Sequence, residues 1–439
     1  MEKKSTLIKR TAEEWIEFGD EAFNNGDYET AFQYYKNAIM ENSSSPFAYF
    51  KAGNSLSMLK KWQEAIKYYI GTITLDPTFS FAYYKKGLCH LELLQINDAI
   101  KDFTTAIELN PNFNLAYFRR GYCLYIVKKF EEAIQDFTKA IELDPNYAQA
   151  YIYRGNCYFH LQNHNQAIAD YDKAIELNPS DPKVFISRGV VNLKLGQYKE
   201  AIGDFTLAIS IDDKNYLAYN YRGFCFNQLK QYDLAIEDFE KVISLKSDFT
   251  DAYNNIGIAY VGLKQFDKAI EYFDKAIELN PKSATIYFNR GNANLQLKNY
   301  VEAIIDYDKA ITIDPNYAYA FYGRGQANYV LEQWRDALRD YSKAIALKPD
   351  FINAYIARGN VYLKMKHLKK ALEDFTTAIE LDPENPIPYL NRAIAYRSDN
   401  IFSYAAADFN EFLRLYRKED RLAEKVRTWI RNMGYAPEY

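Results

Sequence analysis

Residues 114–147, NLAYFRRGYCLYIVKKFEEAIQDFTKAIELDPNY, decide the fold, because they contain two apolar patterns of helical period around a short polar joint. The first pattern consists of Ala116, Tyr117, Gly121 and Leu124, and the second of Ala133, Ile134, Phe137, Ala140 and Ile141. The joint lies around Lys128, and Pro145 ends the second helix, since proline cannot continue it. Two helices of this length cannot bury their apolar faces alone, so the stretch predicts copies of itself on either side.

The copies are present along nearly the whole chain. A pattern of 34 residues runs twelve times from Ala12 to Glu419 without an insertion or deletion. With each repeat numbered 1 to 34, position 20 is Ala in all twelve repeats and position 24 is always Tyr or Phe. Position 8 is Gly in eleven repeats, and Ala393 replaces it in the twelfth. Position 32 is Pro in eight repeats, as at Pro77, Pro111 and Pro383.

This pattern resembles the tetratricopeptide repeat, which reads aromatic-x2-Leu-Gly-x2-Tyr, then Ala-x3-Phe, then Pro. The fifth repeat matches it with Tyr151, Gly155, Tyr158, Ala167, Tyr171 and Pro179. The resemblance implies an all-α fold, a right-handed superhelical solenoid of twelve helix-turn-helix repeats in which each repeat contacts its neighbours.

The chain is therefore expected to consist of a polar lead-in, 1–11, the repeats, 12–419, and a capping helix with a tail, 420–439. The repeats are 12–45, 46–79, 80–113, 114–147, 148–181, 182–215, 216–249, 250–283, 284–317, 318–351, 352–385 and 386–419. The tail has Leu422, Val426, Trp429, Ile430 and Met433 at helical spacing before Gly434, a C-cap residue. We read this helix as a cap, because the last repeat of such an array needs a polar outer face.

Small residues predict where the two helices of a repeat cross. We expect Gly at position 8 to face Ala at position 20, with the aromatic residues of positions 4 and 24 beside that contact. The four cysteines, Cys89, Cys123, Cys157 and Cys225, all occupy position 10. Free cysteine behaves as a small buried hydrophobe, so we expect neither a disulfide framework nor a zinc site.

Composition excludes several function classes. The 54 basic residues nearly balance the 58 acidic ones, whereas a general nucleic-acid or membrane binder would show a basic excess. We find no apolar run of transmembrane length and no signal-peptide core, so the expected location is the cytoplasm. No phosphate loop, nucleophile elbow or HExxH motif occurs, and His160 and His164 lack further ligands, so we expect no enzyme, no metal and no cofactor.

Two positions vary together among the repeats. Position 7 is basic in nine repeats, and position 23 is Asp in the same nine, as in Arg120 with Asp136. In the other three repeats both change: Phe18 with Tyr34, Ala52 with Tyr68 and Ile256 with Tyr272. We expect a contact between the helices of one repeat, because the planar guanidinium can hold a carboxylate with two hydrogen bonds. The alternative is that these cations bind an acidic ligand.

The resemblance implies that positions 2, 5, 6, 9, 12 and 13 of each first helix line a concave groove that binds an extended peptide or a partner helix. In repeats 2 to 4 they combine basic, aromatic and amide side chains: Lys51, Lys85, Arg119, Phe47, Phe50, Asn54, Phe81, Tyr84, Phe118 and Tyr122. In the second half they carry amides, among them Asn255, Asn289 and Asn292, which can both donate to and accept from a peptide backbone. We expect the groove aromatics to be exposed, the alternative being that neighbouring helices partly cover Phe50, Tyr84 and Phe118.

These features predict a non-catalytic adaptor or scaffold that binds a protein partner. The candidate site is the groove of repeats 2 to 4, and the expected ligand is an extended peptide with acidic and aromatic residues. Two alternatives remain: a single-stranded RNA binder that stacks bases on the groove aromatics, and a regulatory subunit of a separate enzyme. The acidic charge balance argues against the RNA binder.

Overall fold

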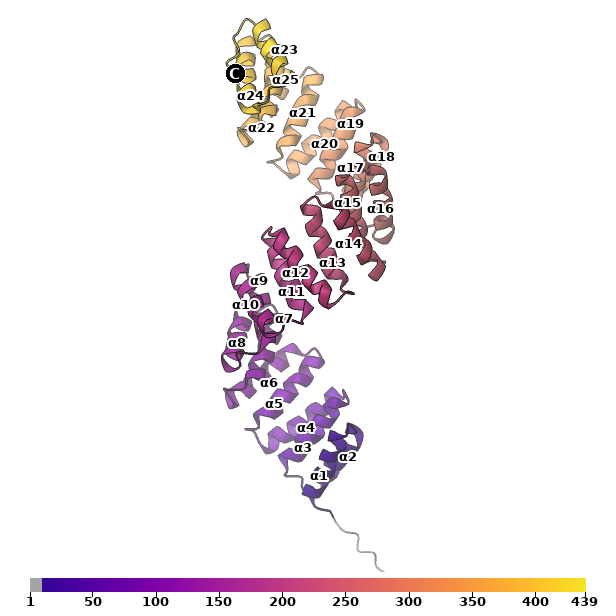
Figure 1. Cartoon of the computed structure of the whole chain (residues 1–439), viewed down its shortest axis with the longest axis vertical. Coiled ribbons are helices and arrows are strands. Elements are labelled where there is room, and N and C mark those ends of the chain that lie inside the picture. Colours follow the sequence, from indigo (N-terminus) through magenta and orange to yellow (C-terminus); the bar gives the residue numbers. More distant parts are fainter. Residues whose placement is uncertain (1–9) are drawn as a thin grey trace, which may run out of the picture. The chain divides into compact units, whose positions relative to one another are not determined.

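The computed structural model describes residues 10–439, so most of the lead-in predicted for 1–11 lies outside the described residues. Within residues 10–439 the secondary structure consists of 25 α-helices and no strand (Figure 1). The chain divides into two compact units, one ending at Ala218 and the other running from Tyr219 to Tyr439. The boundary falls inside helix α13 (Tyr216–Gln228).

The helices follow the predicted repeat closely. In the N-terminal unit they are α1 (Ala12–Asn24), α2 (Tyr28–Glu41), α3 (Pro46–Met58), α4 (Trp62–Leu75), α5 (Ser80–Glu92), α6 (Ile96–Leu109), α7 (Asn114–Ile126), α8 (Phe130–Leu143), α9 (Ala148–His160), α10 (His164–Leu177), α11 (Pro182–Lys194) and α12 (Tyr198–Ile211). In the C-terminal unit they are α14 (Tyr232–Leu245), α15 (Thr250–Gly262), α16 (Phe266–Leu279), α17 (Ala284–Gln296), α18 (Tyr300–Ile313), α19 (Ala318–Val330), α20 (Trp334–Leu347), α21 (Ile352–Lys364), α22 (Leu368–Leu381), α23 (Pro386–Ser398), α24 (Phe402–Tyr416) and α25 (Arg421–Asn432).

A left-handed residue joins the two helices of every repeat. Position 15 has positive φ in all twelve repeats, for example 58° at Lys60 and 62° at Lys128. The backbone N–H of Lys61 donates back to the carbonyl of Leu56, which satisfies a carbonyl at the end of α3. Only Gly26 and Gly196 are glycine among these twelve residues. The hydrogen-bonded turn therefore holds a conformation that most side chains disfavour.

The core of each repeat forms where glycine meets an aromatic ring. A Cβ atom at Gly121 would lie 3.0 Å from Cε1 of Phe137, and one at Gly257 would lie 2.5 Å from Cε1 of Phe273. The prediction that position 8 faces Ala at position 20 is thus wrong in its detail: the ring of position 24 lies directly over the glycine. The alanine is still required to be small, because it is fully buried in all twelve repeats, as at Ala133.

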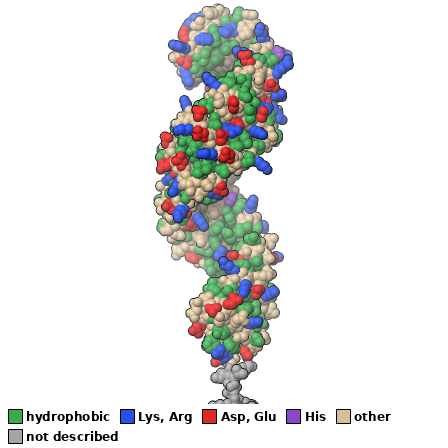
Figure 2. All heavy atoms as spheres, turned by 90° about the vertical axis from the view of Figure 1, so that its right-hand side faces the viewer, with side chains coloured by type: hydrophobic (Ala, Val, Ile, Leu, Met, Phe, Trp, Pro, Cys, Tyr) green, Lys and Arg blue, Asp and Glu red, His purple; other side chains and the backbone are tan. Residues whose placement is uncertain are grey.

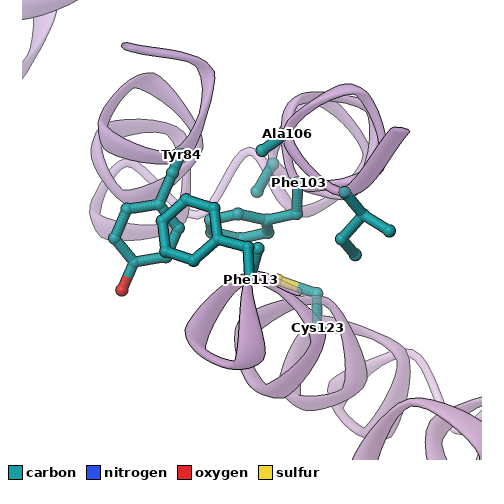
Figure 3. Packing of buried hydrophobic residues seen from close by; sticks show 8 residues of the cluster. Tyr84, Phe103, Ala106, Phe113 and Cys123 are labelled. Atoms are coloured by element: carbon teal, nitrogen blue, oxygen red, sulfur yellow. The ribbon is translucent and has the colours of Figure 1, made fainter. Parts of the chain in front are cut away.

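The four cysteines are free and fully buried, as their repeat position predicts. Cys123 packs in a cluster with Phe103 and Phe113 (Figure 3). Burial raises the pKa of Cys123, Cys157 and Cys225 to about 12 and that of Cys89 to about 11. These thiols stay protonated at neutral pH, whereas the thiolate is the reactive form.

We therefore expect all four cysteines to resist a thiol-specific reagent in the folded chain at pH 7.5. In urea, where burial is lost, four thiols per chain should react quickly. The absorbance change of an aromatic disulfide reagent measures both states. Rapid reaction of any thiol in the folded chain would contradict the packing described for position 10.

The tail forms the predicted helix α25, which packs on α24. Val426 and Ile430 are fully buried in a cluster with Phe409 and Phe412. The ring of Trp429 lies 5.4 Å from that of Phe409 and 4.2 Å from the guanidinium carbon of Arg397. Asp420 begins the helix and accepts hydrogen bonds from the backbone N–H groups of Leu422 and Ala423.

Truncation after Asp420 should expose Phe412 and its apolar neighbours to water. We expect the shortened chain to self-associate and to unfold at a lower temperature, because a repeat array without a polar end face loses solubility. Light scattering and thermal unfolding measure the two effects. A chain that ends at Met433 keeps α25 and is the control; equal solubility of both chains would mean that α25 is not a cap.

Candidate functional site

Two hollows of the surface are lined mainly by first helices of the repeats. We define the helix-A face as positions 2, 5, 6, 9, 12 and 13 of these helices. In the N-terminal unit a cleft of about 900 Å³, here the repeat-5 cleft, is lined by Leu91, Glu92, Leu94, Ile96, Phe118, Arg119, Tyr122, Ile126, Gln149, Ile152, Tyr153, Asn156, Asp181, Lys183 and Ser187. In the C-terminal unit a pocket of about 330 Å³, here the repeat-11 pocket, is lined by Tyr322, Gln326, Tyr329, Val330, Tyr341, Asn353, Ile356, Ala357, Asn360, Asn385 and Ile387.

The structure separates the three predicted groove cations. Arg119 lines the repeat-5 cleft together with Phe118 and Tyr122. Lys51 instead lies 2.6 Å from Asp20, in a hollow of about 280 Å³ that Asn54 also lines. Lys85 is half-buried on α5 and is not part of the cleft lining. The basic row predicted across repeats 2 to 4 is therefore one paired lysine, one lysine beside the cleft and one arginine within it.

Arg119 is the best-placed cation on the helix-A face. Its guanidinium carbon lies 5.6 Å from the ring centre of Phe118. Its Nε atom is buried, and no acceptor within residues 10–439 lies within hydrogen-bonding distance of it. A buried donor without an acceptor costs free energy, so this guanidinium is a cation that the described residues leave without an anionic partner.

The expectation that the aromatic residues of position 5 are exposed is wrong. Phe118 is 2% exposed and Tyr84 is 7% exposed, because an aromatic residue at position 34 of the same repeat covers each of them. Figure 3 shows this ring, Phe113, packed against Tyr84 and Phe103. The ring centroids of Phe118 and Tyr147 are likewise 4.7 Å apart. Rings of position 34 thus bury Tyr84 and Phe118, and Phe50, which packs on Phe79, is half-buried. The alternative interpretation predicted this covering but assigned it to neighbouring helices.

Position 2 carries the exposed aromatics instead. Phe47 is 57% exposed and Phe81 is 49% exposed on the helix-A face of repeats 2 and 3. Each still touches the position-34 ring of its own repeat at one edge, at 5.4 Å for Phe47 with Phe79 and 4.8 Å for Phe81 with Phe113.

The predicted amide residues already use part of their hydrogen-bonding capacity. The hydroxyl of Tyr69 donates to Oδ1 of Asn54, and that of Tyr307 donates to Oδ1 of Asn292. Asn289 donates to Asn254 at 2.9 Å. Asn54 and Asn292 keep their amide N–H groups for a ligand, but their carbonyl oxygens are occupied. Asn255 is half-buried, and none of the three second-half asparagines lines the repeat-11 pocket.

The basic residues of position 7 are structural, as the covariation predicts. Arg154 donates from Nε and Nη2 to both carboxylate oxygens of Asp170, at 2.8 and 2.6 Å. Its Nη1 reaches the hydroxyl of Thr138 in the preceding repeat at 3.1 Å. One guanidinium therefore joins three helices. Burial raises the pKa of the Asp170 carboxyl, and the hydrogen bonds from Arg154 oppose that shift.

The same pairing occurs in the other eight repeats that have the basic and acidic residues, with Lys86 in place of arginine in the third. In repeats 6, 9 and 10 the arginine is shared with an aspartate of the preceding repeat: Asp172, Asp274 and Asp308. In these three repeats Asn192, Asn294 and Asn328 donate to the position-23 aspartate at 3.0 Å. Asn at position 11 thus occurs together with Asp at position 25 of the preceding repeat. This second covariation is visible in the sequence, but the predictions above did not include it.

Sequence reasoning also missed the residues that open the cleft. Tyr153 and Lys183 complete its wall beside Arg119, and Ile152 and Asp181 occupy the positions where other repeats have aromatic rings. The signal was available, because positions 5 and 34 are either both aromatic or both non-aromatic in every repeat except the seventh.

The surface contains charges of both signs. On the face shown in Figure 2, acidic and basic side chains are interspersed. Within residues 10–439 no three His, Cys, Asp or Glu side chains come together as metal ligands would. In the same part of the chain no helix has the length and apolar character that crossing a membrane requires.

Comparison with known families agrees with the repeat. Models described as tetratricopeptide repeat match residues 47–78, 80–113, 115–147, 148–181, 170–203, 216–249, 254–318 and 352–385, and one described as TPR repeat matches 329–366. A search of curated proteins finds no match.

Several solved structures are similar. YrrB, described as a TPR protein with an unusual peptide-binding site, is 30% identical over 41% of this chain and 92% of its own, with a TM-score of 0.38. MamA is 30% identical over 39% of this chain and 94% of its own, with a TM-score of 0.37. Yeast Tom70 is 17% identical over 96% of this chain and 95% of its own, with a TM-score of 0.45.

The ion pair of repeat 5 can be tested against the apolar pair that repeat 8 uses in its place. Asp170→Ala leaves Arg154 without its carboxylate and should cost about 3–5 kcal/mol of unfolding free energy. The double change Arg154→Ile with Asp170→Tyr copies Ile256 and Tyr272, where Tyr272 stacks on Tyr260 at 5.5 Å. Repeat 5 has Tyr158 at the position of Tyr260, so the copied pair has its stacking partner.

We expect the double variant to unfold at a higher urea concentration than Asp170→Ala, with circular dichroism as the measurement. Glu237→Ala, which removes an exposed carboxylate of α14, is the control. A double variant less stable than Asp170→Ala would show that the pair is not exchangeable.

Proposed function

Because the chain belongs to the tetratricopeptide repeat family, we propose that it is a non-catalytic adaptor that binds an extended peptide of a partner protein on its helix-A face. The principal site is the repeat-5 cleft, and the ligand is a peptide in which a carboxylate lies between aromatic residues. This assignment keeps Arg119, Phe118 and Tyr122 from the sequence prediction and moves the site toward the C-terminus by about one repeat. The proposed location is the cytoplasm, where free thiols stay reduced.

Arg119 is the observation that carries the proposal. Its buried Nε has no hydrogen-bond acceptor within the described residues, and the residue lines the largest of the hollows described above. A carboxylate placed on the guanidinium would pair with a cation that is already partly desolvated, which makes a charge-assisted hydrogen bond stronger than at an open surface.

Besides Arg119, the cleft contains one further cation and two carboxylates. Lys183 adds a second, exposed cation on α11. Asp181 is engaged, because its carboxylate accepts a hydrogen bond from the backbone N–H of Lys183 at 2.9 Å and caps α11. Glu92 is exposed at the end of α5. An acidic residue of the ligand is therefore favoured beside Arg119, and basic residues are tolerated at the rim.

Aromatic and apolar walls favour large side chains on either side of the carboxylate. Phe118, Tyr122 and Tyr153 lie close together, with the rings of Tyr122 and Tyr153 5.2 Å apart. Aromatic residues and arginine dominate the binding energy of protein interfaces. Asn156 accepts from the hydroxyl of Tyr171 at 2.7 Å, which leaves its amide N–H groups directed toward a peptide carbonyl.

The proposal is tested with a labelled synthetic peptide in which glutamates alternate with phenylalanine and tyrosine. Arg119→Met, which keeps the length of the side chain and removes its charge, should raise the Kd of this peptide about 30-fold, or about 2 kcal/mol. Lys51→Met is the matched control: Lys51 is paired with Asp20, so its loss should change the Kd less than about twofold. Fluorescence anisotropy measures both values.

A peptide with lysine in place of each glutamate should bind at least tenfold more weakly to the unchanged chain. Equal affinity of the two peptides, or an unchanged Kd in Arg119→Met, would contradict the assignment. Tighter binding of single-stranded RNA than of either peptide, with an affinity that falls steeply with salt, would favour the nucleic-acid function instead.

A further inference from the structure

Both large hollows of the helix-A face occur where one aromatic ring is missing. In repeats 2, 3, 4, 9 and 10 an aromatic residue at position 34 packs on an aromatic residue at position 5 of the same repeat. The ring centroids are 4.7 to 5.0 Å apart in the five pairs, which are Phe50–Phe79, Tyr84–Phe113, Phe118–Tyr147, Phe288–Tyr317 and Tyr322–Phe351. We call the position-34 residue the plug ring.

In six other repeats neither position 5 nor position 34 is aromatic; repeat 7, with Asn220 and Phe249, is the exception. In four of these repeats the polar residue at position 34 caps the next helix: Ser45, Asp181, Asn215 and Asn385. Ser283 makes no such hydrogen bond. A plug ring and a side-chain cap exclude each other at position 34, because an aromatic side chain that covers position 5 cannot also accept a hydrogen bond from the start of the next helix. The repeat that gains a cap loses the ring that covers its groove.

The repeat-5 cleft and the repeat-11 pocket both lie at repeats that have a capping residue in place of a plug ring. Ile152 and Asp181 of repeat 5 line the repeat-5 cleft, and Ile356 and Asn385 of repeat 11 line the repeat-11 pocket. In each case an isoleucine and a short polar residue stand where the preceding repeat has two rings. The space that opens therefore has the position and the apolar walls of an aromatic side chain.

The repeat-11 pocket differs from the repeat-5 cleft in charge. None of the residues that line it is ionised at neutral pH, and four of them are amides: Gln326, Asn353, Asn360 and Asn385. Its volume of about 330 Å³ is at the lower end of ligand pockets, which fits one or two side chains. A charged ligand group would lose its hydration there without a counter-ion.

Asn360 is suited to a peptide backbone. At the same repeat position, Asn54, Asn156 and Asn292 each accept a hydrogen bond from the tyrosine at position 24. Repeat 11 has Phe375 at position 24, which has no hydroxyl group. Asn360 therefore keeps both its carbonyl and its amide N–H groups, and can pair with the N–H and the carbonyl of one residue of an extended peptide.

We propose that the repeat-11 pocket is a second peptide-binding site, which takes an aromatic side chain from an uncharged extended segment of a partner at the place of the missing plug ring. Asn360 holds the backbone of that segment. This inference rests on the proposed function, because it requires that the helix-A face binds peptides, but it assigns a separate site with a different ligand preference.

Two matched variants restore the plug ring, one in each hollow. Ile356→Tyr with Asn385→Phe copies the pair Tyr322 and Phe351 from the preceding repeat. Ile152→Phe with Asp181→Tyr copies Phe118 and Tyr147 in the same way. Both variants lose one helix cap, so the effect of the cap is equal in the two. Circular dichroism checks that each variant keeps its helical content.

Each variant is titrated with two labelled peptides. The first alternates glutamate with phenylalanine and tyrosine, and the second has serine and asparagine in place of glutamate. We expect Ile356→Tyr with Asn385→Phe to weaken binding of the uncharged peptide at least tenfold and to leave the acidic peptide unchanged. The variant in repeat 5 should do the opposite. Asn360→Leu, which adds no ring, should also weaken the uncharged peptide about tenfold.

Other outcomes separate the two claims. If the acidic peptide binds as proposed but the uncharged peptide does not bind, or binds equally to the restored repeat-11 variant, the second site is wrong and the proposed function stands. If the uncharged peptide is lost on closing the repeat-5 cleft instead, both peptides share one site and the inference is overturned. If neither peptide binds the unchanged chain, both the inference and the proposed function fail.

Discussion

The close contact between the glycine of position 8 and the aromatic ring of position 24 sets the distance between the two helices of a repeat. A Cβ atom at Gly87 would lie 2.8 Å from Cε1 of Phe103, so even alanine would force the ring or the helix to move. The last repeat has Ala393 at this position, still fully buried. The contact recurs in eleven repeats, and the array keeps its 34-residue register without insertions.

The contacts between the two helices of a repeat also determine which side chains are free to bind a ligand. The ring of position 24 lies below the helix-A face, and where it is tyrosine its hydroxyl orients the residue of position 9, as Tyr171 does for Asn156. The guanidinium of position 7 is held by an aspartate and by the preceding repeat. The residues that we propose for binding are ones that these contacts leave without a partner: Arg119 in one unit and Asn360 in the other.

The sequence alone predicted the helices, the repeat length, the pairing of positions 7 and 23, and the burial of the cysteines, because each depends on residues that recur twelve times. It did not predict which groove aromatics are covered. Phe118 and Phe81 have the same chemistry at neighbouring positions, but only the structure shows that Tyr147 covers the first while the second is 49% exposed. Exposure of a groove residue depends on contacts with position 34, which lies after the second helix and far from position 5 in the chain.

The most direct test of the account is to locate the bound peptide. An acidic-aromatic peptide with benzophenone in place of one aromatic ring is irradiated on the whole chain, and the cross-linked residues are identified by mass spectrometry. The account predicts cross-links on α7 and α9, near Arg119 and Tyr153, whose side chains line the cleft. Cross-links confined to the second helices α8 and α10 would place the peptide on the opposite face and contradict it.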